Sequence, residues 1–148
     1  MIDARPTWDQ YFMGFAQHAA TKSRDPSTKV GCVMVGPDRD IRATGFNGLP
    51  RGVEDHPDRM ERPAKYIWTC HAEENAIAHA ARAGTSMLGC TAYVTHSTCA
   101  RCARSMIQAG IDKVVVGQGH LIAASYIEEW DIARAMFKEA GVLVHHLE

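Results

Sequence analysis

Two cysteines stand three residues apart at the start of a predicted helix. Residues at this spacing share one helical face, so the sulfurs of Cys99 and Cys102 can act together. The exposed N–H groups and the positive end of the helix dipole there favour thiolates, the form of cysteine that binds metal. Taken alone, the pair is equally consistent with a metal site, a dithiol redox pair, or two small buried side chains.

A histidine and a glutamate precede this pair by one strand and one helix. On a regular helix, residues i and i+2 point about 200° apart. His71 and Glu73 can therefore converge only if His71 lies before the helix proper. Both helix starts should follow the same edge of a sheet, where α/β proteins place their sites. One imidazole and two thiolates make three ligands, the number typical of a catalytic zinc whose fourth position is left to water.

These residues, together with three further segments, resemble a known protein family. H-x-E at 71–73 followed by C-x-x-C at 99–102 is the signature of zinc-dependent cytosine and adenine deaminases. Segments 25–31, 45–52 and 71–77 resemble the deoxycytidylate (dCMP) deaminases of the zinc-dependent cytidine/deoxycytidylate deaminase family. The likeness runs from about residue 8 to about residue 116.

The resemblance implies a reaction and a set of residue roles. Water would replace the amino group of dCMP, giving dUMP and ammonia, with Glu73 accepting and returning the proton. Asn47 would hold the deoxyribose, although asparagine between glycines is also a common turn residue. Arg51 would meet the phosphate, with a solvated loop charge as the alternative. Arg82 would lie near subunit contacts of a homo-oligomer, a hexamer in the family, where a regulatory nucleotide can bind with Mg²⁺.

Two departures from the family pattern affect the edges of the site. The family usually has proline directly before the first cysteine, where this chain has Thr98. The hydroxyl of Ser97 or Thr98 is expected to cap the helix instead. The segment 118–125 lacks the polar sequence expected there, which leaves the phosphate-binding residues undefined.

The hydrophobic pattern predicts helices alternating with strands. Thr7 and Gln10 have capping-box spacing at the start of a first helix, which should end near 23–26. The expected strands are 30–35, 41–46, 90–95, 112–117 and 142–144, the expected loop is 47–63, and the next helices are 71–83 and 99–109. One face of the first helix should carry Trp8, Tyr11, Phe12, Phe15 and Ala19, and a last helix should carry a core stripe of Tyr126, Trp130, Ala133, Phe137 and Ala140. This order predicts a cytidine-deaminase-like three-layer α/β/α sandwich with a mixed five-stranded sheet.

Composition sets the broad class of protein. The 148 residues, 46% of them hydrophobic, suit a single domain over 1–148. The formal net charge of −1 argues against a nucleic-acid polymer as partner. The sequence shows no secretory signal or membrane span, so we expect a cytoplasmic protein in which Cys32, Cys70 and Cys90 are small buried residues.

Other functions remain open from the residues. A related deaminase would act on dCTP, a 5-substituted dCMP, deoxycytidine or another amino-heterocycle. A non-catalytic zinc module or a dithiol redox protein would belong to a different class. Glu73 argues against that class, because a structural zinc site has no use for a neighbouring carboxylate.

Overall fold

Five strands form one mixed sheet at the centre of the chain. The computed structural model describes residues 2–119 and 124–148. Its elements, in chain order, are α1 (Trp8–Ala20), β1 (Gly31–Val35), β2 (Ile41–Phe46), η1 (Pro57–Met60), α2 (Lys65–Trp68), α3 (Ala72–Ala83), β3 (Thr91–His96), α4 (Ala100–Ala109), β4 (Lys113–Gly119), α5 (Ala124–Glu139) and β5 (Leu143–His146). The strands are ordered β2-β1-β3-β4-β5. β1 is antiparallel to both β2 and β3, whereas β3, β4 and β5 run parallel. The predicted mixed sheet is confirmed.

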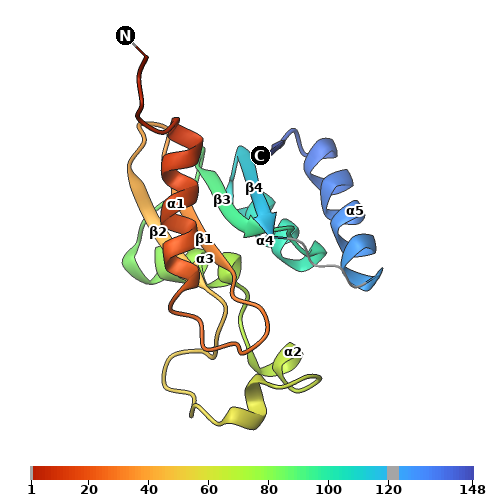
Figure 1. The fold of residues 1–148 in the computed structure, drawn as a ribbon. Helices are drawn as coiled ribbons and strands as arrows, with labels where there is room; N and C mark the ends of the chain where they lie inside the picture. Colours follow the sequence, from red (N-terminus) through yellow and green to blue (C-terminus); the bar gives the residue numbers. More distant parts are fainter. Residues whose placement is uncertain (1, 120–123) are drawn as a thin grey trace.

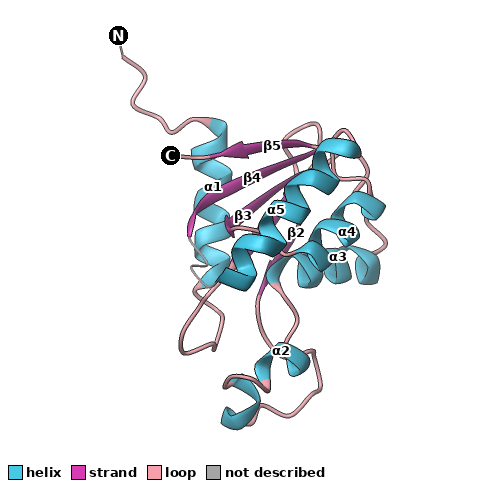
Figure 2. Cartoon of the chain, turned by 90° about the vertical axis from the view of Figure 1, so that its right-hand side faces the viewer, coloured by secondary structure: helices cyan, strands magenta, loops and turns pink. Residues whose placement is uncertain are grey.

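Helices cover both faces of this sheet. α1 packs on one face, and α3, α4 and α5 lie on the other (Figures 1 and 2). Strand alternation divides the core accordingly. In β4, Val115 faces the α1 side, while Val114 and Val116 face the three-helix side. The three-layer α/β/α prediction is therefore correct.

The buried face of α1 differs from the prediction. Its buried residues are Phe12, Met13, Ala16 and Ala20. Trp8, Tyr11 and Phe15 keep 51%, 44% and 40% of their surface exposed. The aromatic spacing defines a face of the helix, but the small residues Ala16 and Ala20 are the ones that allow close approach to the sheet. Gly31 shows how close, since a Cβ there would lie 1.8 Å from the Ala16 carbonyl oxygen.

The predicted loop 47–63 contains structure of its own. It includes η1 and leads into α2, and this part of the chain extends from one end of the sheet (Figure 1). The segment 118–125 overlaps residues 120–123, which lie outside the described residues, as does the side chain of Tyr126. No helix within the described ranges is both long and apolar enough to cross a membrane.

Candidate metal and catalytic site

Two helices begin at the predicted metal ligands. His71 is the N-cap of α3, with extended backbone angles (φ −77°, ψ 160°), so it precedes the helix as the spacing required. Cys99 is the N-cap of α4, and its sulfur accepts a hydrogen bond from the Cys102 N–H at 3.4 Å. The cap prediction for Ser97 or Thr98 is thus wrong. The sulfur itself takes the place of a capping hydroxyl, because the helix begins one residue later than that prediction assumed.

The three ligand atoms lie close enough to share one ion. The Nδ1 atom of His71 is 3.3 Å from the sulfur of Cys99 and 3.3 Å from that of Cys102. A tetrahedral zinc, about 2.05 Å from nitrogen and about 2.3 Å from sulfur, would hold such atoms roughly 3.5 Å apart. These residues also form the one His/Cys/Asp/Glu group found within the described ranges that could hold a metal. The donor set and its spacing therefore fit zinc.

Mutual hydrogen bonding shifts the protonation of these ligands. The contact with Cys99 raises the pKa of His71. Hydrogen bonds from Cys102 and His71 lower the pKa of Cys99, and the same coupling with Cys99 raises the pKa of Cys102. The group thus shares protons that must leave when a metal binds.

Glu73 lies beside this group and is nearly inaccessible to solvent. It is 3% exposed, in the first turn of α3. Burial raises the pKa of its carboxyl; His71 opposes the shift, and the nearby Cys99 sulfur adds to it. A carboxyl whose pKa is raised accepts a proton more readily than an ordinary glutamate does, as a general base must.

A glutamate and an arginine join the two helix starts. Glu74 accepts a hydrogen bond from the His71 N–H at 3.0 Å, which completes a capping box, and from Arg101 Nη2 at 2.9 Å. Arg101 stands between the two cysteines, so this pair links the metal-ligand ends of α3 and α4. Our sequence reasoning missed it. Glu74 at the third position after His71 was the available signal, because that spacing is typical of a capping box.

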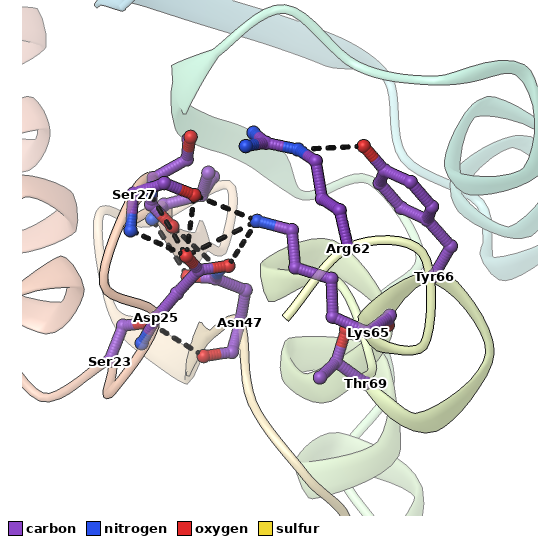
Figure 3. Close-up of polar contacts among 10 residues, drawn as sticks. Ser23, Asp25, Ser27, Asn47, Arg62, Lys65, Tyr66 and Thr69 are labelled. Carbon is purple, nitrogen blue, oxygen red and sulfur yellow. Dashed lines mark hydrogen bonds and ion pairs between the residues drawn. The ribbon is translucent and has the colours of Figure 1, made fainter. Parts of the chain in front are cut away.

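A pocket opens onto Glu73 and the metal group. Its walls are formed by Asp25, Thr28, Val30, Asn47, Arg62, Lys65, Tyr66, Thr69, His71, Ala72, Glu73, His96, Ser97 and Cys99. On one wall the Lys65 ammonium donates to both oxygens of Asp25, at 2.9 and 3.2 Å (Figure 3). Asp25 also accepts from the N–H groups of Ser27 and Thr28. Burial raises the pKa of Asp25, but the bonds from Lys65 and these amides outweigh it and hold that pKa below its usual value.

Asn47 lines the pocket, but its amide is engaged by the protein. Its Oδ1 accepts from the Val30 N–H at 2.8 Å, and its Nδ2 donates to the Thr28 carbonyl at 2.9 Å and to Asp25 Oδ2 at 3.5 Å. These bonds support the turn interpretation of this residue. After these bonds, Oδ1 can still accept one hydrogen bond from a ligand. A sugar-binding role for Asn47 stays a prediction.

Arg51 and Arg82 lie outside the pocket walls. Arg51 Nη2 is 3.2 Å from Nε2 of His79, whose Nδ1 contacts the Thr44 carbonyl at 2.6 Å. His79 therefore donates through Nδ1 and accepts from Arg51 through Nε2. Arg82 is exposed in the last turn of α3. The structure does not bring either arginine to the site, and their roles stay predictions.

Thr98 has a buried hydroxyl directly before the first metal-ligand cysteine. Its side chain is 1% exposed, and its Oγ1 forms no well-aligned hydrogen bond with the described residues, but it lies close enough to Glu73 to lower the pKa of that carboxyl. A buried hydroxyl without a well-formed hydrogen bond is unusual in a folded protein and costs stability. Of the other cysteines, Cys32 and Cys90 are buried as expected, whereas Cys70 is only partly buried.

Known proteins resemble this chain in sequence and in fold. Residues 6–118 match the family model of the cytidine and deoxycytidylate deaminase zinc-binding region. An uncharacterized deaminase from the luxG 3′ region of Aliivibrio fischeri is 42% identical over 138 residues, covering 93% of this chain and 91% of the relative. Mouse deoxycytidylate deaminase is 38% identical over 143 residues, covering 91% and 76% of the two chains.

A solved structure gives the same result in three dimensions. The dCMP deaminase of cyanophage S-TIM5, in complex with dCMP and dUMP, superposes with a TM-score of 0.77 at 27% identity, covering 98% of this chain and 100% of that one. The chain belongs to the cytidine and deoxycytidylate deaminase family.

Proposed function

We propose that this protein is a zinc-dependent hydrolase that deaminates dCMP to dUMP and ammonia. The observation that carries the proposal is the buried Glu73 carboxyl, in a pocket beside three residues spaced for zinc. Relatives named deoxycytidylate deaminases, and a neighbour solved with dCMP and dUMP, support dCMP as the substrate.

The residues divide the chemistry between them. His71, Cys99 and Cys102 would hold the zinc, which supplies Lewis acidity to a water molecule in the pocket. Glu73 accepts a proton from the attacking water as its oxygen bonds to C4 of cytosine, and delivers that proton to N3. Glu73 then takes the remaining proton from the new hydroxyl on C4 and delivers it to the amino group. The C4–N bond breaks, ammonia leaves, and the ring carbonyl of dUMP remains.

Further parts of the proposal concern the domain, the assembly, the cellular location and the regulation of the protein. We infer one deaminase domain over residues 1–148, assembled as a cytoplasmic homo-oligomer that acts on a free nucleotide. Contact of Arg82 with a regulatory nucleotide and Mg²⁺ at a subunit interface belongs to the same proposal. Analytical ultracentrifugation with and without dCTP and Mg²⁺ tests both the assembly and its response.

Ammonia release from purified protein tests the reaction itself. The zinc-loaded chain is offered dCMP, dCTP, deoxycytidine, cytidine and guanine in parallel. We expect dCMP to give the highest kcat/KM. If another compound gave the highest kcat/KM, that compound would replace dCMP as the assigned substrate. Absence of dCMP turnover would overturn the proposal. A zinc-free chain that cycles a Cys99–Cys102 disulfide would instead favour the dithiol redox class.

A further inference from the structure

Arg62 is a cation on the pocket wall without a carboxylate partner in the described part of the chain. Its Nε donates to the hydroxyl of Tyr66 at 2.8 Å, and both side chains line the pocket. No carboxylate among the described residues forms an ion pair with it. Lys65 on the same wall differs, because Asp25 already neutralises it at 2.9 Å. Arg62 therefore leaves this wall with an unneutralised positive charge.

The contact with Tyr66 fixes which donors of Arg62 remain. A planar guanidinium has one N–H donor on Nε and four more on its two Nη atoms. Figure 3 shows the Nη atoms pointing away from Tyr66, toward the side of the pocket where Ser27 and Lys65 lie. The Tyr66 hydroxyl accepts from Nε, so its own hydrogen is available to a ligand. Both side chains are exposed at the pocket wall, and together they present mainly hydrogen-bond donors to a ligand.

A group of donors of this kind suits a phosphate group. Arginine binds phosphate through paired N–H···O bonds, which are stronger than bonds between neutral groups. Arg51, in contrast, is bound to His79 outside the pocket. Arg62 is therefore better placed than Arg51 to meet an anionic part of a ligand whose base reaches Glu73.

We infer that Arg62, oriented by Tyr66, binds the 5′-phosphate of the substrate and makes the enzyme prefer a nucleotide to its nucleoside. This inference rests on the proposed deamination of dCMP. It assigns a specificity-determining role to two residues outside the metal and proton-transfer machinery. Tyr66 acts mainly as a positioning residue, because its hydroxyl holds the guanidinium at Nε.

The test compares dCMP with deoxycytidine, which lacks the phosphate. In the zinc-loaded enzyme, Arg62→Ala should lower kcat/KM for dCMP by about 10- to 100-fold, mainly through KM, since a charge-assisted interaction is lost. The kcat/KM for deoxycytidine should change by less than about 3-fold. Arg62→Lys should fall between wild type and Arg62→Ala, because it keeps the charge but not the paired N–H donors. Tyr66→Phe should raise KM for dCMP by about 3- to 10-fold and add little to Arg62→Ala in the double variant.

Arg59→Ala is the matched control. Arg59 lies in η1, stacks over the Trp68 ring at 4.0 Å and donates to the Glu54 carbonyl, and it is not among the residues lining the pocket. It should leave the dCMP-to-deoxycytidine preference unchanged. Where deoxycytidine turns over too slowly, inhibition by dUMP and deoxyuridine gives the same comparison. The inference would be overturned if Arg62→Ala lowered kcat/KM equally for dCMP and deoxycytidine. It would also be overturned if Arg59→Ala changed the preference for dCMP as much as Arg62→Ala does. Absence of dCMP turnover in wild type would instead overturn the proposed function.

Discussion

The metal-ligand region and the segment 47–69 face the same pocket but are held in different ways. His71 and Cys99 begin helices that pack on a sheet whose central strands β1, β3 and β4 are largely buried. In segment 47–69, only Gly48, Met60 and Lys65 are buried. A buried ion pair from Lys65 to Asp25 fastens that segment to the rest of the chain. Apolar packing thus positions the reacting groups, whereas polar bonds position the residues that we expect to recognise the substrate.

The largest effect should come from the metal-ligand region. Glu73→Gln keeps the shape of the side chain but removes its proton-accepting oxygen, and general acid–base catalysis contributes about 10²- to 10⁴-fold. We therefore expect kcat for dCMP to fall by that factor while zinc content and thermal stability are retained. Steady-state kinetics measure kcat, metal analysis measures the zinc content, and thermal denaturation measures the stability. Loss of zinc together with activity would mean that Glu73 supports the metal rather than moving a proton.

Breaking the ion pair should release segment 47–69. Lys65→Met leaves the Asp25 carboxylate buried without its partner, which costs about 3–5 kcal/mol of unfolding free energy. Urea denaturation measures this change, and zinc content should stay the same because the ligands lie elsewhere.

A matched variant shows whether burial is what matters. Arg5→Ala removes the exposed pair between Arg5 and Asp3, which is 2.6 Å long, and should leave the unfolding free energy nearly unchanged. If Lys65→Met were equally mild, the buried pair would not be the anchor of the segment.

Acid should weaken the same anchor selectively. The folded-state pKa of Asp25 is lowered, so the folded protein binds this proton less readily than the unfolded chain does. Its contribution is complete above the ordinary pKa of 3.8 and is lost as pH falls through the lower folded-state value. The difference in unfolding free energy between wild type and Asp25→Asn should therefore shrink below about pH 4. A difference that stays constant with pH would show that the carboxylate charge is not what stabilises the fold.

The smallest effect is expected at Thr98. Thr98→Val replaces a buried hydroxyl that lacks a well-formed hydrogen bond with a methyl group of similar size, which should raise the unfolding free energy by at most about 1 kcal/mol. Chemical denaturation of the zinc-loaded protein checks this, with Thr98→Ser as the variant that keeps the hydroxyl. A loss of kcat in Thr98→Val that Thr98→Ser restores would indicate that the hydroxyl acts on the reaction.

Residues whose chemistry is unusual could be predicted from the sequence, and residues held by distant partners could not. Zinc requires sulfur and imidazole at fixed spacings, so the grouping of His71 with the two cysteines follows from residue types alone. The hydrogen bond from Arg51 to His79 spans 28 residues, and nothing local to Arg51 indicates it. Lys65 is 6% exposed, against the general preference of lysine for solvent. Its burial depends on Asp25, which is 40 residues away.

The two N-cap positions have a consequence for folding. His71 and Cys99 are 28 residues apart in the sequence, and their side chains meet where α3 packs against α4. The unfolded chain therefore lacks the assembled three-ligand site, and zinc favours the native state in proportion to its free concentration. A chelator would accordingly lower the melting temperature as well as the activity. The cell's supply of zinc would set how long the folded enzyme persists.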